Sequence, residues 1–147
     1  MCGGVEAREA DRIWRIYFPN PKAALPVLDE NGQLEWITWG RRKGEPGNGP
    51  QGGWARADTI ARGGWAKYRP ILALALVQRF MEKEGTADSK GKRASHWFDV
   101  PTRDALECLI HDDGGRRRAY IVTTTPPAEY QWIHDRWPQM ARLPHVA

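Results

Sequence analysis

The sequence predicts one strand-rich α+β domain spanning residues 1–147, with short helices between its strands. Two observations predict the strands. Asn31-Gly32 is a strong hairpin signal, and it lies between the apolar segments 25–28 and 34–39. The continuous apolar run 71–77 is typical of a central strand that is buried on both faces.

The first part of the chain predicts one helix, an extended segment and a loop. Residues 5–15 mix charge with Ile and Trp and favour a short amphipathic helix. Residues 17–21 contain two prolines, which push the preceding residues out of the helical region, so we expect an extended segment. Residues 40–53 are rich in Gly, Pro and Arg and predict a long loop, which in a small domain is usually functional or mobile. Residues 54–64 then predict a short helical piece.

The second half of the chain predicts strands joined by polar turns. Phe80-Met81-Glu82 would carry the 71–77 strand to the surface, and the lysine-rich residues 84–95 would form a solvated hairpin loop. We interpret Arg116-Arg117-Arg118 as a solvated strand entry, with phosphate binding as the less favoured alternative. The further strands are expected at residues 96–100, 105–110 and 120–124.

The last element is predicted to be a helix from Thr125 to about His134, limited by Pro138. Thr125 is a suitable capping residue, and a proline in the first helical turn is tolerated. Glu129 would face the positive end of the helix dipole.

Composition excludes several classes of protein. No window has the ~18 consecutive apolar residues that a membrane span requires, and no secretory signal opens the chain. Cys2 and Cys108 form no disulfide framework, and the four histidines include no pair at metal-ligand spacing. We therefore expect a cytoplasmic, monomeric protein that binds no metal and no cofactor.

Aromatic usage is uneven, with eight tryptophans against three phenylalanines and a formal net charge of +4. Exposed Trp and Arg side chains together suit stacking on unpaired bases and pairing with phosphates. The alternative is that most of the tryptophans pack in the core or at its rim. The charge alone indicates an anionic partner only weakly.

Met1-Cys2-Gly3-Gly4 is the segment with the clearest chemical potential. Once the initiator methionine is removed, Cys2 carries two nucleophiles, an α-amine with a pKa of ~7.7–8.0 and a thiol with a pKa of ~8.5. The amine can capture an aldehyde as an imine, and the thiol can then close a five-membered thiazolidine. The alternative is that Cys2 is the second residue of a frayed terminus.

Three separated segments match one family pattern. They are Met1-Cys2-Gly3, then Trp39-Gly40 with Ala55-Arg56-Ala57-Asp58-Thr59, and finally Ile133-His134-Asp135-Arg136-Trp137-Pro138. In this order they resemble the SRAP family (SOS response-associated peptidase), whose members crosslink to abasic sites in single-stranded DNA. Arg79-Phe80-Met81-Glu82 and Tyr120-Ile121-Val122-Thr123-Thr124 resemble two further family segments.

The resemblance implies a β-barrel-like core and a set of site residues. It implies that Cys2 is the nucleophile, that Glu82 holds or deprotonates its amine, and that His134 relays the proton that opens the sugar ring. Arg56 and Arg136 would bind the flanking phosphates. Trp54, which stands where the family usually has Asn, would stack on a base near the lesion, and Trp39 would also contact DNA.

The same resemblance implies an autopeptidase that releases Met1 and an enzyme that processes abasic single-stranded DNA. It also suggests a short member of the family, because typical members continue beyond Pro138 with another helix and closing strands. Two alternatives stay open. One is a relative that binds unpaired or damaged DNA without covalent chemistry, and the other is an N-terminal-nucleophile amidohydrolase that acts on small amides.

Overall fold

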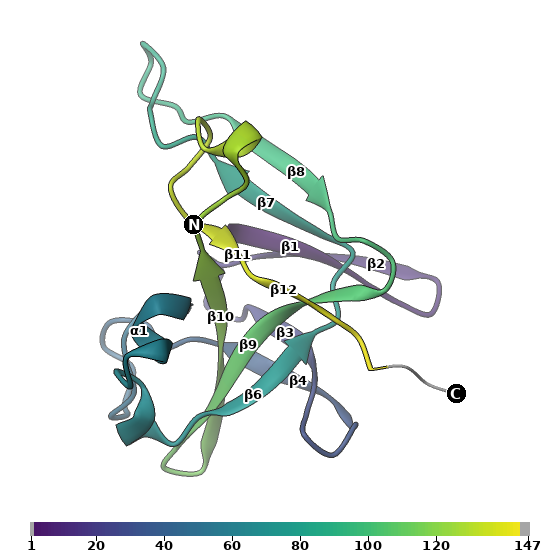
Figure 1. Cartoon of the computed structure of the whole chain (residues 1–147), viewed down its shortest axis with the longest axis vertical. Coiled ribbons are helices and arrows are strands. Elements are labelled where there is room, and N and C mark those ends of the chain that lie inside the picture. Colours follow the sequence, from purple (N-terminus) through teal and green to yellow (C-terminus); the bar gives the residue numbers. More distant parts are fainter. Residues whose placement is uncertain (1, 145–147) are drawn as a thin grey trace.

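The computed structural model describes residues 2–144, which form two sheets stacked one above the other (Figure 1). The upper sheet is antiparallel, has the order β2-β1-β7-β8, and consists of β1 (Cys2–Glu9), β2 (Arg12–Tyr17), β7 (Arg79–Lys83) and β8 (Ser95–Asp99). Strand β2 is an edge strand of this sheet and pairs with β1. The sheet therefore places the start of the chain, β1, between β2 and β7.

The lower sheet closes into a small barrel (Figure 1). Its ring runs β10-β4-β3-β6-β9 and returns to β10 through the β9–β10 hairpin. The ring strands are β3 (Ala24–Leu28), β4 (Leu34–Trp39), β6 (Ile71–Ala75), β9 (Asp104–Asp113) and β10 (Arg116–Thr124). Three short strands extend it, namely β5 (Trp54–Arg56) and β11 (Trp137–Pro138) on β10, and β12 (Met140–Arg142) on β9.

Helical structure in the described chain is limited to three short pieces. They are α1 (Ala57–Ala61) and two 3₁₀ turns, η1 (Ala66–Tyr68) and η2 (Ala128–Tyr130). The predicted strand-rich α+β class with short helices is therefore confirmed. Between residues 2 and 144, no helix combines the length and apolar composition needed to cross a membrane.

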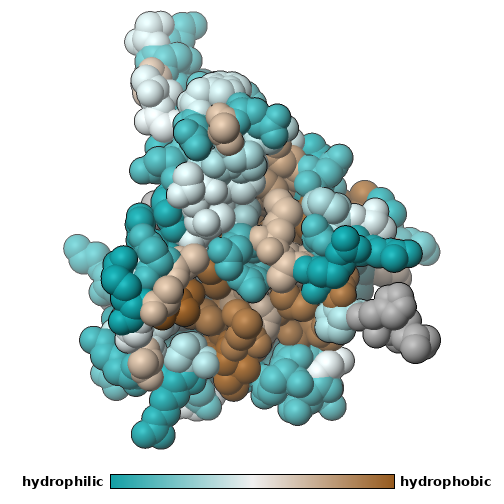
Figure 2. Space-filling model, viewed as in Figure 1, coloured by the Kyte–Doolittle hydropathy of each residue, from teal (hydrophilic) through white to brown (hydrophobic). Residues whose placement is uncertain are grey.

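One apolar core lies between the two sheets. It joins Cys2, Val5 and Phe80 of the upper sheet to Leu25 and Ile121 of the barrel. A smaller cluster, centred on Trp65 and Tyr120, packs α1 and η1 against the barrel. The barrel also exposes apolar residues to solvent: Figure 2 shows a hydrophobic area over β6 and β9, and Ile71 and Leu72 lie there partly exposed.

The helix expected at residues 5–15 is wrong, because this segment is the β1–β2 hairpin. Val5 and Ala7 are two positions apart in β1 and share its buried face, whereas Glu6 between them is only partly buried. They lie opposite Ile16 and Trp14 in register. The segment 17–21, expected to be extended, instead turns, and the Asn20 amide donates to the Tyr17 carbonyl at 3.0 Å.

The helix expected at residues 125–134 is also wrong, and only η2 forms there. Pro127 pushes the preceding residue, Pro126, out of the helical region, and Pro127 itself is extended, with ψ at 149°, so no helix starts at Thr125. His134 consequently follows a turn at residues 131–133 rather than lying on a helix face with Tyr130.

The apolar run 71–77 does not continue into Phe80-Met81-Glu82 as one strand. Strand β6 ends at Ala75, and the chain crosses from the barrel to the upper sheet before β7 begins. The crossing is fixed at both ends, since the Leu76 amide donates to the Pro26 carbonyl and the Gln78 amide donates to the Glu6 carbonyl, each at 2.8 Å.

The arginine run is not a solvated strand entry throughout, because Arg118 is completely buried. Its guanidinium donates to the carbonyls of Gly40 and Pro46 and lies 3.7 Å from the Asp113 carboxylate. That carboxylate in turn accepts the amides of Asn48 and Gly49. The alternation of a strand points Arg118 inward, where it holds the 40–53 loop against the barrel.

Candidate functional site

Cys2 lies directly opposite Glu82, because β1 pairs with β7 in the register Cys2↔Glu82 and Gly4↔Met81. Gly3 is bulged out of this register. Gly4 leaves no room for a side chain, since a Cβ there would lie 2.8 Å from the Ile16 carbonyl oxygen. The small residues after Cys2 thus allow the start of β1 to enter the sheet between β2 and β7.

Cys2 is completely buried in this structure. Its thiol donates to the Gly4 carbonyl at 3.3 Å, and burial strongly raises the pKa of that thiol. The thiol is therefore held in its neutral form, which is a weak nucleophile. The other candidate nucleophile of Cys2, its α-amine, becomes available only when the preceding peptide bond is cut.

Glu82 has no exposed surface, and burial raises the pKa of its carboxyl from 4.5 to about 7. A carboxyl with this pKa exchanges protons readily near neutral pH, as a general base for an amine requires. Its position opposite Cys2 on the neighbouring strand suits this role.

Trp54 contacts the backbone of Cys2 directly, because its indole N–H donates to the Cys2 carbonyl at 3.0 Å. Trp39 packs edge-on against Trp54, with ring centroids 5.0 Å apart, and stacks on Phe18 at 4.5 Å. Trp39 is nearly buried and Trp54 is half-buried. The two tryptophans from β4 and β5 therefore form one wall beside Cys2.

His134 is brought to the same place by the turn that follows η2. Its Nδ1 accepts the Arg136 amide at 3.1 Å and lies 2.9 Å from a carboxylate oxygen of Asp135. Burial lowers the pKa of His134, so its imidazole is mainly neutral at pH 7. A neutral imidazole can relay a proton between two oxygen atoms.

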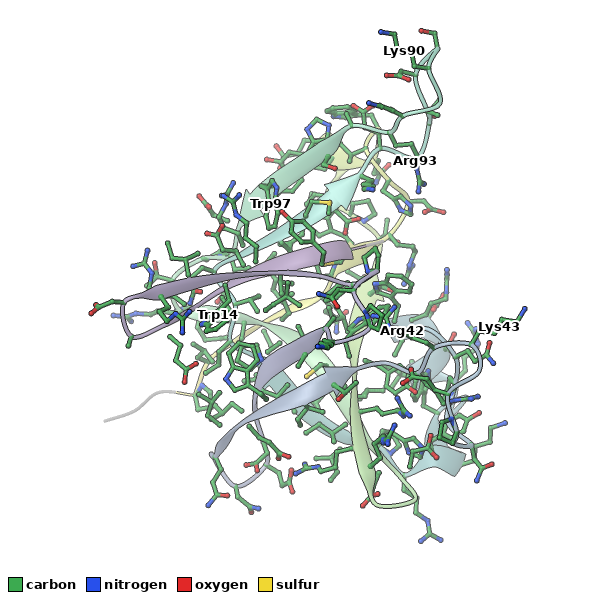
Figure 3. All side chains as sticks on the ribbon, turned by 180° about the vertical axis from the view of Figure 1, so that it is seen from behind. Trp14, Arg42, Lys43, Lys90, Arg93 and Trp97 are labelled. Atoms are coloured by element: carbon green, nitrogen blue, oxygen red, sulfur yellow. The ribbon has the colours of Figure 1, made fainter. Side chains whose placement is uncertain are left out.

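A cavity of about 400 Å³ lies beside the first residues of β1, but the buried Cys2 and Glu82 are not among the residues that line it. Gly3, Trp39, Trp54 and His134 line it. Three cations also line it, namely Arg42, Lys83 and Arg93. Figure 3 shows Arg93 and Arg42 on two separate loops of the same side of the molecule. The remaining lining residues are Tyr17, Phe18, Pro19 and Met81.

The two arginines predicted to bind phosphate do not line this cavity. Arg56 forms a bidentate pair with Asp58, with N–O distances of 3.0 and 2.9 Å. The guanidinium of Arg136 donates to the carbonyl and the hydroxyl of Thr123. Arg136 lies next to His134, because its amide donates to the His134 Nδ1, and Arg56 lies beside it, because β5 pairs Arg56 with Thr123. Their role in DNA binding stays a prediction.

The cations that line the cavity were missed from the sequence. Arg42 belongs to the 40–53 loop and Arg93 to the 84–95 loop, and both segments were identified only as loops. The signal available was their richness in Lys and Arg. What the sequence could not supply is the packing that brings the two loops to one cavity, where Arg42 donates to the Phe18 carbonyl and lies 5.4 Å from the Trp39 ring.

Within residues 2–144, no group of three or more His, Cys, Asp or Glu side chains is placed to hold a metal ion. Comparison of the chain with protein-family models, with curated proteins and with solved structures finds no match.

Proposed function

We propose that this protein captures abasic sites in single-stranded DNA through the aminothiol of Cys2, after removal of Met1. The observation that carries the proposal is the pairing of Cys2 with the buried Glu82, beside a cavity lined by His134 and Trp54. Its volume of about 400 Å³ suits an opened deoxyribose with part of its backbone. The resemblance of the sequence to the SRAP family supports the same chemistry.

The reaction begins at the α-amine. Glu82 takes the proton of the α-ammonium group, and the free amine attacks the aldehyde carbon of the opened sugar. His134 relays the proton needed to open the sugar ring, and loss of water leaves an imine. The Cys2 sulfur then adds to the imine carbon, while its proton passes to the nitrogen. The product is a thiazolidine, which links the protein to the DNA.

The cations support DNA as the partner. Arg42, Lys83 and Arg93 place three positive charges around the cavity, and strand phosphates on either side of a lesion would neutralise them. Trp54 would position the nucleophile, because its indole N–H donates to the carbonyl of Cys2 and so orients the amine of the same residue.

One observation favours a second candidate function, the binding of damaged DNA without covalent chemistry. The thiol of Cys2 is buried and hydrogen-bonded to Gly4, so ring closure requires it to leave that position. A protein in which the thiol stays there would form only a reversible imine or would only bind.

Intact mass after incubation with abasic single-stranded DNA tests these candidates. We expect the protein that lacks Met1 to give an adduct that survives denaturation without a reductant. Cys2→Ala keeps an amine, so its adduct should appear only after borohydride reduction. A chain with extra residues before Cys2 should form neither adduct. Covalent capture by that blocked chain would disprove the assignment of Cys2, whereas binding without any adduct would favour the second candidate.

A further inference from the structure

A second cavity, of about 460 Å³, lies next to the first one at the seam between the upper sheet and the barrel. Strand β2 forms one side of it and is unusual, because every residue of that edge strand except Ile16 is exposed. Trp14 of β2 and Trp36 of β4 meet edge to face across the seam, with ring centroids 6.5 Å apart. We call this cavity the seam groove.

The two indoles of the seam groove are accessible to a ligand. Trp14 is 39% exposed and Trp36 is 38% exposed, whereas Trp39, Trp65 and Trp137 are buried. Exposed indoles that face a groove offer flat apolar surfaces on which planar rings can stack. Figure 3 shows Trp14 on the outside of the molecule, at the hairpin end of the upper sheet.

The charge of the seam groove suits an anion. Arg15 and Lys22 line it, and the Arg12 guanidinium lies 4.5 Å from the centre of the Trp14 ring. Glu9 is the acidic residue among those that line it. Arg15 is partly neutralised by Glu6, at 3.1 Å, whereas Lys22 has an exposed side chain at the rim. Planar stacking surfaces together with cations are the combination that binds unpaired nucleotides.

Tyr17 connects the two cavities, because it lines both of them. It is 44% exposed. A strand whose lesion occupies the first cavity would therefore pass over Tyr17 to reach the seam groove. We propose that the seam groove is a second subsite, which binds one or two unpaired nucleotides that flank the lesion. This proposal rests on the proposed function for its partner, but it concerns undamaged nucleotides and needs no covalent step.

The test measures equilibrium binding of undamaged oligo-dT of 3, 6 and 12 nucleotides by fluorescence anisotropy. Wild type should gain affinity with length as the strand reaches the groove. Trp14→Ala and Trp36→Ala should weaken binding of the 12-mer by roughly 5- to 150-fold, the range for loss of one base stack. They should leave adduct formation with an abasic trinucleotide unchanged. Trp132→Ala, which removes a 66% exposed tryptophan that lines neither cavity, is the matched control.

Lys22→Glu keeps the test decisive if an alanine variant does not fold, because it leaves both indoles in place. We expect it to weaken the 12-mer, whereas Lys90→Glu on the distant hairpin tip should have a much smaller effect (Figure 3). Unchanged affinity for the oligonucleotides in all groove variants would overturn the proposal. If the affinity is unchanged and the melting temperature of the Trp variants falls, the role of the two indoles is to hold the two sheets together. A dimer that Trp14→Ala dissociates, with oligonucleotide affinity unchanged, would assign the groove to a second copy of the chain. Absence of any adduct alongside length-dependent binding would instead count against the proposed function alone.

Discussion

At the scale of single residues, Glu82 is the side chain whose environment departs most clearly from that of a surface carboxyl. Strand β7 points it into the interior opposite Cys2, and no part of it is exposed. A carboxyl in such a place is stabilised in its protonated form, which is why its pKa rises to about 7. The same burial that suits a general base is costly for the folded state at neutral pH.

Glu82→Gln is expected to change both stability and reaction rate. In the folded wild type the carboxyl holds its proton up to about pH 7, whereas in the unfolded chain it loses it near 4.5. The free energy of unfolding should therefore fall as pH rises from 4.5 to 7, by on the order of 3 kcal/mol at most, and the variant should lack this fall. Urea denaturation of both proteins at pH 5 and pH 8 measures it.

The rate of imine formation gives the second measurement on the same variant. With Glu82 as base, the rate should rise through a midpoint near pH 7, and in Glu82→Gln the midpoint should move to ~8, the pKa of an ordinary α-amine. Asp99→Asn is a suitable control, because Asp99 has a highly exposed carboxylate on the strand next to β7. Identical midpoints in all three proteins would remove Glu82 from the mechanism.

At the scale of elements, the 40–53 loop is held by the barrel rather than by its own sequence. The carboxylate of Asp113 accepts two of its amides, Arg118 donates to two of its carbonyls, and the Tyr120 hydroxyl donates to the Pro50 carbonyl at 2.7 Å. Gly53 closes the loop against Trp39, whose ring would lie 1.9 Å from a Cβ at that position. This fixation positions Arg42 and Trp54 at the cavity.

Asp113→Ala is expected to destabilise the protein by about 1–3 kcal/mol, because it removes the acceptor of the Asn48 and Gly49 amides and leaves Glu45, at 3.7 Å, as the remaining carboxylate beside the buried Arg118. Asp112→Ala is the matched control, since Asp112 is exposed and accepts only the Gly115 amide of the same hairpin. Thermal unfolding followed by circular dichroism compares the two. Equal losses of stability would mean that the loop is not held through Asp113.

Strands and turns with local signals could be predicted from the sequence, and elements that depend on distant partners could not. Asn31-Gly32 specifies its hairpin by itself, so β3 and β4 were placed correctly. Residues 5–15 were expected to form a helix because charged residues are interspersed among the apolar ones. The strand conformation of β1 depends on its pairing with β7, which is distant in sequence. Glu82 and His134 were identified through a family pattern. Arg42, Lys83 and Arg93 meet only through packing.

At the scale of the whole molecule, the two sheets share one core and should unfold together. Phe80 of the upper sheet packs against Trp137 of β11, with ring centroids 5.0 Å apart, and β11 pairs with β10 of the barrel. Phe80 has no exposed surface. A contact of this kind couples the stability of one sheet to that of the other.

Phe80→Ala is expected to lower the free energy of unfolding by about 3–5 kcal/mol. Both sheets should still unfold in a single transition, with a lower midpoint temperature. Far-UV circular dichroism and tryptophan fluorescence should give the same midpoint in both wild type and variant. Leu72→Ala, at a 60% exposed position of the barrel, should change that midpoint little. Two separate transitions in the variant would show that the sheets are independent units.

The position of β1 between β2 and β7 has a consequence for the order of events during synthesis. The neighbour that completes the burial of Cys2 begins at Arg79, so the ribosome needs roughly 4–16 s to reach it at ~5–20 residues per second. During that interval the Met1–Cys2 bond, whose cleavage the proposed function requires, is not yet covered by β7. We infer that removal of Met1 competes with the pairing of β1 and β7. A chain that folds before Met1 is removed must release β1 from the sheet or cleave itself. Intact mass of nascent chains arrested before residue 79 would show whether the methionine has gone by then.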